Sequence, residues 1–200
     1  MTAGSFTLPM PGFLRHQRLD QDLFAGKRVL DIGCGRKKLP GAVGLDRHPL
    51  PGVDVVADLD GSLPFPDHSF DAVSANQVLE HVGNLVGLVH EVHRVLRPGG
   101  LLVAHVPYFR SSWAHIDPTH VRSFTINSMD YFVAGTHCHE HYRFGERAFC
   151  RIQVMLDCDF PPRMARALFA ALALRFPTRF ENSFVSSLFV FQQLTFVLEK

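Results

Sequence analysis

The residues of this chain best suited to chemistry are glycines and carboxylates that directly follow short apolar runs. Residues 29–32, with the sequence Val-Leu-Asp-Ile, lead into Gly33-Cys34-Gly35, and the next two apolar runs end at Asp46 and Asp58. If these runs are parallel strands, their carboxyl ends meet where such sheets bind ligands. Glycines there let a ligand approach the main chain, and carboxylates accept hydrogen bonds from hydroxyl and amino groups. The pattern favours an adenosine-bearing ligand.

A second group of reactive side chains lies between Trp113 and Phe124, where histidine, aspartate and aromatic residues are concentrated. We expect His120 to act as a general base or to orient a substrate, with Asp117 setting the His120 tautomer or contacting the substrate. An alternative stays open, because an Asp-Pro-Thr-His sequence also forms capped turns in which the side chains hydrogen-bond to the backbone.

Alternating strand and helix patterns must position these residues. Strands are predicted at residues 27–32, 42–46, 53–57, 71–75, 101–106, 150–156 and 188–198. Helix patterns cover residues 13–24, 77–96 and 162–175. Residues 36–41 are too few for a full helix before the second strand, so we expect a turn there. The alternation indicates a Rossmann-like, doubly wound α/β fold with a mostly parallel sheet in three layers, α/β/α.

Length and composition favour a single domain, residues 1–200, with a sizeable core. The 20 Lys and Arg residues nearly balance the 19 Asp and Glu residues, so no strong field favours nucleic acid, and a small or neutral partner is expected. The four cysteines lack Cys-x-x-Cys spacing, and the N-terminal residues lack a signal-peptide pattern. Both observations favour a cytoplasmic protein.

Three further segments complete the pattern: Leu-Pro-Phe-Pro-Asp-His-Ser-Phe-Asp at residues 63–71, Val-Leu-Glu-His-Val at 78–82 and Arg-Val-Leu-Arg-Pro-Gly-Gly at 94–100. With the glycine turn, they resemble class I S-adenosylmethionine-dependent methyltransferases of type 11 over residues 27–107. The resemblance implies seven strands with the last one antiparallel, S-adenosylmethionine as cofactor and S-adenosylhomocysteine as product. A dinucleotide-dependent dehydrogenase fits less well, because Lys38 stands where the dinucleotide motif has its third glycine.

The resemblance assigns most cofactor contacts to residues at the strand ends. It implies that the main chain at Gly33 and Gly35 approaches the methionine and ribose portions of the cofactor. Asp46 would accept hydrogen bonds from the ribose hydroxyls. Asp58 and the backbone of Leu59 would lie at the adenine amino group. A strand-end aspartate is also a common turn or cap residue, so a structural role is the alternative for each carboxylate.

Other residues are expected near the methionine end of the cofactor. Asp31 would set the glycine loop and favour the cofactor's ammonium group, with Asn76 in the same neighbourhood. The shortened first helix offers little N-terminal dipole to the cofactor's carboxylate, so we expect Lys38, or its neighbour Lys37, to pair with that carboxylate. The alternative is that these lysines are solvated surface residues.

The methyl acceptor is expected to bind outside the cofactor-binding core, residues 27–107. Residues 108–148 are interpreted as a substrate lid and residues 149–200 as C-terminal strands and helix. The Asp-Pro-Thr-His segment resembles one bacterial subset of the family. Tyr108, His115 and His81 are candidate substrate residues, with core packing as the alternative for Tyr108 and capping or packing for His81.

The histidines at positions 137, 139 and 141 raise the question of a metal, since imidazole is a common zinc ligand. They share one face only if the segment is extended. Because no second ligand cluster has familiar spacing and methyl displacement needs no metal, we assign no metal and expect a solvated or substrate-facing loop.

The segment at residues 164–176 is apolar around most of a helix but too short to span a bilayer. We expect it to pack against the sheet, with a homodimer interface and a peripheral membrane contact as successive alternatives. The expected activity is in-line methyl transfer to a small-molecule or glycan acceptor, with oxygen slightly preferred over nitrogen or carbon. The alternative is a cofactor-binding, non-catalytic partner subunit. Nucleic-acid modification is disfavoured because no basic stripe is present.

Overall fold

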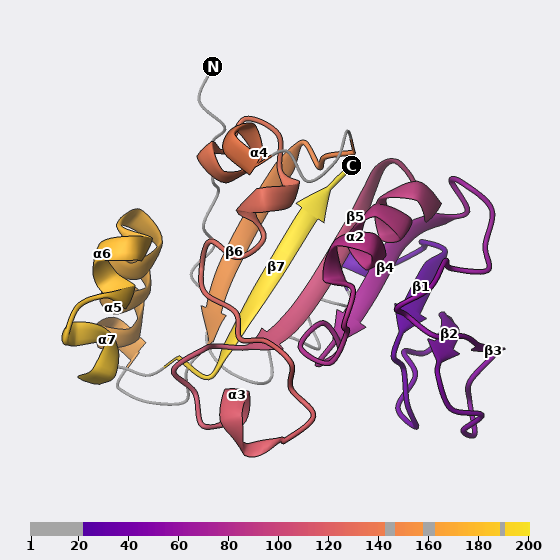
Figure 1. The fold of residues 1–200 in the computed structure, drawn as a ribbon, viewed down its shortest axis with the longest axis horizontal. Coiled ribbons are helices and arrows are strands. Elements are labelled where there is room, and N and C mark those ends of the chain that lie inside the picture. Colours follow the sequence, from indigo (N-terminus) through magenta and orange to yellow (C-terminus); the bar gives the residue numbers. More distant parts are fainter. Residues whose placement is uncertain (1–21, 143–146, 158–162, 189–190) are drawn as a thin grey trace.

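The computed structural model describes residues 22–142, 147–157, 163–188 and 191–200. Seven strands form one mixed sheet in the order β3-β2-β1-β4-β5-β7-β6 (Figure 1). Their bounds are β1 Val29–Ile32, β2 Val43–Asp46, β3 Val55–Val56, β4 Phe70–Asn76, β5 Leu96–Pro107, β6 Arg151–Asp157 and β7 Gln193–Glu199. Strands β1 to β5 are parallel, and β7 is antiparallel to both of its neighbours, β5 and β6. The predicted seven-stranded, Rossmann-like sheet is confirmed.

The crossover from β1 to β2 contains no helix. Residues 33–42 form turns, as expected from their small number. The amide of Cys34 donates to the carbonyl of Leu45, and that of Ala42 to the carbonyl of Leu39, so the short loop folds back beside β2. The glycine turn therefore stands directly at the carboxyl ends of the parallel strands, called here the carboxyl end of the sheet.

Helix α2 (Leu85–Val95) packs one face against the sheet through Leu88, Val89, Val92 and Val95. It begins at Leu85 and not at residue 77, because the side chain of Asn84 caps it by accepting from the amide of Gly87. Gln77, with φ of +55°, has a left-handed backbone that a helix excludes. Residues 77–84 consequently form an irregular turn after β4, and this turn carries the Val-Leu-Glu-His-Val motif to the carboxyl end of the sheet.

The segment predicted as one lid, residues 108–148, divides into two parts. Helix α3 (Trp113–Ile116) lies beyond the carboxyl ends of β4 and β5, whereas helix α4 (His137–Tyr142) lies at the opposite end of the sheet (Figure 1). The 3-10 helix η1 (Asp130–Phe132) accompanies α4, and the Phe132 carbonyl accepts from the amide of Phe149, just before β6 begins. Only the first part of the segment is placed to meet a ligand at the glycine turn.

Three C-terminal helices, α5 (Arg163–Arg175), α6 (Pro177–Glu181) and α7 (Val185–Leu188), lie together beyond β6 (Figure 1). They reach the hydrophobic core through the buried side chains of Ala173 and Phe180. Leu168 in α5, Leu188 in α7 and Phe184 in the turn between α6 and α7 are more than half exposed. Leu188 ends a helix, so the last strand is shorter than predicted and begins at Gln193.

None of the helices in the described ranges is long and apolar enough to cross a membrane. Of the helix expected at residues 13–24, positions 13–21 lie outside the described residues, and residues 22–24 are helical.

Candidate active site at the carboxyl end of the sheet

The two glycines after β1 have different surroundings. Both have positive φ, +62° at Gly33 and +53° at Gly35, a backbone region that favours glycine. At Gly33 a Cβ atom would collide with the side chain of Val78, so this glycine permits close packing between the glycine turn and the turn after β4. At Gly35 the described residues leave the corresponding space open within 4 Å. Gly35 is thus the glycine whose open side can face a ligand.

Two buried carboxylates fix the glycine turn. Asp46, at the end of β2, accepts from the amide of Gly35 through Oδ2 and from the amide of His48 through Oδ1, both at 2.9 Å. Asp31, within β1, accepts from the amide of Leu39 at 2.8 Å through Oδ2 and so holds the far end of the loop. A carboxylate has about four acceptor positions. The two backbone bonds of Asp46 therefore leave acceptor capacity for a ligand's hydroxyl groups.

The remaining strand-end residues reach the same end of the sheet. Asp58 follows β3, is exposed, and accepts from the amide of Asp60 at 3.0 Å, which is the turn role considered as the alternative. Leu59 is half-buried and packs against the core. Asn76 is the last residue of β4 and is exposed. All three lie at the ends of strands that neighbour β1 or β2 in the sheet.

Lys38 has a partner that the sequence did not indicate. Its ammonium group pairs with Asp54 at 2.7 Å, and its aliphatic chain packs over Gly44 in the middle of β2. The pKa of Asp54 is lowered by a hydrogen bond from the Gly44 amide and by Lys38. This ion pair engages the ammonium group of Lys38 in the structure, so a contact between Lys38 and the cofactor's carboxylate stays a prediction. Lys37 is exposed, and its amide bonds to the carbonyl of Cys34.

A compact group of ionisable side chains, Glu80, His81 and His120, adjoins the glycine turn. We call it the Glu80 cluster. Glu80 lies two residues after Val78, which contacts Gly33, and its carbonyl accepts from the amide of Val121 at 2.9 Å. The Glu80 side chain is 1% exposed, and its Oε1 lies 4.0 Å from His120 Nε2. Within the described residues, neither carboxylate oxygen of Glu80 has a hydrogen-bond partner. Burial raises the pKa of Glu80 to about 7.

Hydrogen bonds orient both imidazole rings of the Glu80 cluster. His120 Nδ1 lies 3.1 Å from the carbonyl of Ala114, an acceptor, so Nδ1 carries the hydrogen. Thr119 Oγ1 lies 2.9 Å from His81 Nδ1 and donates to Asp117 Oδ1 at 2.7 Å. Since the threonine hydrogen is directed at Asp117, the same oxygen accepts from His81 Nδ1. In the neutral rings both Nε2 atoms then carry lone pairs.

This network corrects one of the two roles expected for Asp117, that of setting the His120 tautomer. The bond that sets the His120 tautomer comes from the Ala114 carbonyl, whereas Asp117 accepts both the hydroxyl and, at 2.8 Å, the amide of Thr119. These two bonds lower the pKa of Asp117. The capped-turn alternative is therefore observed, and Asp117 acts on His81 through Thr119. The sequence interpretation had also missed Glu80, although its position beside His81 in the turn after β4 was a signal.

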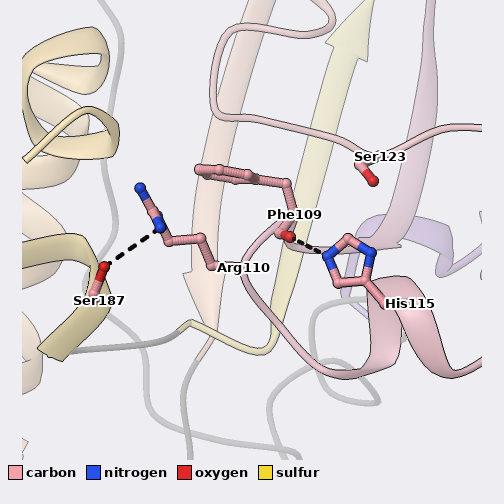
Figure 2. A pocket seen from close by; sticks show the side chains of 5 residues that line it. All are labelled: Phe109, Arg110, His115, Ser123 and Ser187. Carbon is pink, nitrogen blue, oxygen red and sulfur yellow. Dashed lines mark hydrogen bonds between the residues drawn. The ribbon is translucent and has the colours of Figure 1, made fainter.

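An open pocket of about 480 Å³ lies next to α3 and is lined by Phe109, Arg110, His115, Ser123 and Ser187 (Figure 2). His115 Nε2 lies 2.8 Å from the carbonyl of Phe109, which fixes the ring in the pocket wall. Arg110 points the other way, toward Ser187 (Figure 2). Tyr108 is fully buried and packs edge-on against Phe109, which corrects its assignment as a substrate residue. Of the two candidate substrate residues Tyr108 and His115, only His115 lines the pocket.

The histidines at positions 137, 139 and 141 are helical, so the condition for a shared face is not met. His137 and His141 stack on one side of α4 with ring centroids 6.0 Å apart, and His139 Nδ1 lies 3.1 Å from the carbonyl of Tyr131. The Thr136 hydroxyl accepts from the amide of His139, which is a local helix-capping contact. Because α4 lies at the end of the sheet opposite the glycine turn, these histidines are remote from the candidate site (Figure 1).

Comparison with known proteins gives a consistent result. A family model described as "Methyltransferase domain" matches residues 40–104. The chain is 27% identical over 179 residues to demethylmenaquinone methyltransferase of Tropheryma whipplei, covering 75% of this chain and 73% of that protein. It is 35% identical over 115 residues to a probable S-adenosylmethionine-dependent methyltransferase of Mycolicibacterium smegmatis, covering 48% and 45%. A solved SAM-dependent methyltransferase from Archaeoglobus fulgidus has a similar fold, with a TM-score of 0.63 and 18% identity over 94% of this chain and 92% of that one.

Proposed function

We propose that the chain is a class I S-adenosylmethionine-dependent methyltransferase and that it transfers the methyl group to an oxygen atom of a small-molecule acceptor at the carboxyl end of the sheet. One observation carries the proposal. The glycine turn, with open space at Gly35, packs through Val78 directly against the turn that bears the Glu80 cluster. A bound cofactor and a group able to orient an acceptor would then be neighbours.

The residues at the glycine turn fit S-adenosylmethionine. Gly35 offers open space beside its main chain, and Asp46 retains acceptor capacity next to it for the two ribose hydroxyls. We place the adenine at Asp58 and Leu59, and the methionine end near Asn76 and the loop that Asp31 fastens. With Lys38 paired to Asp54, the exposed Lys37 becomes our candidate for the cofactor's carboxylate.

The side chains around the Glu80 cluster support a small apolar acceptor over a glycan. Trp113, Ile116 and Val121 are each at least 60% exposed, and all three lie in or beside α3 and the Asp-Pro-Thr-His turn. Exposed apolar groups gathered at one site favour an apolar or amphipathic ligand. The Tropheryma whipplei relative is named for demethylmenaquinone, which is a small molecule of that kind.

Methyl transfer itself is a displacement that depends on alignment. The acceptor oxygen forms a bond to the methyl carbon while the bond between that carbon and sulfur breaks. The electron pair of the broken bond stays on sulfur, which gives S-adenosylhomocysteine. The acceptor's proton must leave. We propose that His120 takes that proton or orients the hydroxyl, and that His115 helps to bound the acceptor.

The test is turnover with methyl-labelled S-adenosylmethionine and a panel of hydroquinones, phenols, aliphatic alcohols and saccharides. We expect label transfer to at least one hydroxylated apolar compound and none to the saccharides. Transfer to saccharides alone would refute the choice of acceptor class. Tight cofactor binding without turnover on any acceptor, including whole-cell extracts, would instead support the non-catalytic partner subunit.

A further inference from the structure

We propose that the Glu80 cluster binds a divalent transition-metal ion such as Zn²⁺, with Glu80, His81 and His120 as its protein ligands. One ligand atom from each residue can be chosen so that all three lie within 4.8 Å of one another. Two imidazoles and a carboxylate form a donor set typical of catalytic zinc sites that keep an open coordination position. Binding of the ion itself does not depend on the proposed acceptor.

The spacing of the donor atoms suits one shared ion. Bonds from zinc to imidazole nitrogen and carboxylate oxygen are about 2.0–2.2 Å long, so two donors on one tetrahedral ion lie roughly 3.3–3.6 Å apart. The 4.0 Å between Glu80 Oε1 and His120 Nε2 is too long for a hydrogen bond and exceeds that spacing by less than 1 Å, so a modest movement of the two side chains would bring both donors onto one ion. The ligand atom that His81 offers lies within 4.8 Å of the other two donors.

Glu80 supplies a second, independent observation. Its side chain is 1% exposed, and both carboxylate oxygens lack a hydrogen-bond partner in the part of the chain that the structure describes. A buried carboxyl group in that state is costly, and buried charges are normally paired or bound to metal. A cation between Glu80 and His120 would supply the missing partner.

The hydrogen bonds behind the two rings are those that metal-binding histidines normally make. Such histidines donate their second ring N–H to a backbone carbonyl, a carboxylate or a similar acceptor, which turns the other nitrogen toward the metal. His120 uses the Ala114 carbonyl, and His81 uses Thr119, whose hydroxyl is anchored on Asp117. In this proposal the Asp-Pro-Thr-His turn contributes one metal ligand, His120, and orients the other, His81, through Thr119.

A bound ion would decide between the two roles proposed for His120. With Nε2 committed to the metal, His120 positions the acceptor and does not act as its base. An open coordination position beside the exposed His81 would receive the acceptor hydroxyl and lower its pKa, as a Lewis acid does. This consequence, unlike the binding, rests on the proposed methyl transfer.

The experiment is a Co²⁺ titration of chelator-treated protein without a histidine tag, followed by visible absorption and calorimetry. We expect one saturable Co²⁺ site per chain. Glu80→Gln and His120→Ala should each weaken it by about 100-fold or more, because each removes a ligand. Thr119→Val keeps all three ligands but removes the hydrogen bond from His81 Nδ1 to the Thr119 hydroxyl, so it should weaken Co²⁺ binding by about 10- to 100-fold.

The control is the double variant His137→Ala/His141→Ala, which removes the other histidine pair spaced for metal binding on a helix. It should retain the Co²⁺ site and its absorption spectrum. Loss of binding in this variant, absence of saturable binding in the wild type, or unchanged affinity in folded Glu80→Gln would each overturn the proposal. Full methyl transfer after chelation, with no Co²⁺ binding, would refute the metal site while leaving the proposed methyltransferase function intact.

Discussion

Replacement of Asp46 by asparagine provides the sharpest test of where the cofactor binds. In the structure Asp46 fixes the glycine turn through the amide of Gly35, and we propose that its remaining acceptor positions hold the ribose hydroxyls. The asparagine side chain keeps the shape of the aspartate but removes the charge and replaces one acceptor oxygen with an NH₂ donor. The substitution therefore weakens the ribose contact without opening a cavity.

The expected loss follows from the bonds that the charge strengthens. A hydrogen bond to a charged group contributes about 1.5–3 kcal/mol, which corresponds to a decrease in affinity for S-adenosylmethionine of about 10- to 150-fold. The free energy of unfolding should fall as well. The NH₂ group of the asparagine is a donor, and it would face another donor, the backbone N–H of Gly35 or of His48. Folded protein must therefore be titrated well below its unfolding temperature.

The matched control is Asp71→Asn. Asp71 also accepts from a backbone amide, that of Arg28 at 2.8 Å, but it lies near the amino end of β4 and pairs with Arg97. By calorimetry with S-adenosylmethionine and S-adenosylhomocysteine, Asp71→Asn should lose stability and keep its affinity. If folded Asp46→Asn binds both ligands as tightly as the wild type, the placement of the ribose at Asp46 is wrong.

Further predictions concern the glycine turn, Lys38 and a buried acid. Lys38→Ala should keep its affinity for S-adenosylmethionine within about twofold, because its ammonium group serves Asp54; a larger loss by calorimetry would return Lys38 to the cofactor site. Gly33→Ala should lower the free energy of unfolding by about 2–4 kcal/mol through its left-handed backbone and its collision with Val78, and adding Val78→Ala should recover the steric part in urea unfolding. Burial raises the pKa of Asp130 to about 6, so the stability that its protonated form provides is lost as pH rises through that value. The difference in unfolding free energy between wild type and Asp130→Asn should change by up to about 3 kcal/mol from pH 4 to pH 7, and a difference independent of pH would contradict the assignment.

The strand ends were predictable because their signal is local. Asp31, Gly33 and Asp46 stand next to the apolar runs that form β1 and β2, and the short spacing after Gly35 correctly predicted a crossover without a helix. The start of α2 was also encoded locally, in Asn84, but the apolar periodicity extends past that cap into the preceding turn. Periodicity records which residues are buried and does not separate a helix from an apolar turn.

The environment of Glu80 depends on residues distant in the sequence and was not predictable in the same way. Its burial is completed by the backbone of Val121 and the ring of His120, both about forty positions later. The partner of Asp117 is likewise set by how the turn folds, since Thr119 lies between Asp117 and His81. Sequence identifies these side chains as chemically useful, whereas their pairing follows from the packing of residues 119–121, after α3, against the turn after β4.

The position of β7 has a consequence for the order in which the protein folds. β7 follows every other strand in the sequence, yet it lies between β5 and β6 and is buried along most of its length. During synthesis on the ribosome, β1 to β5 emerge first and can pair, while the outer edge of β5 stays unpaired until β7 arrives. An unpaired edge of this kind invites association between chains, and pairing across some ninety residues is slow. The nascent chain should therefore be most prone to aggregation after β5 has formed and before β7 has been inserted.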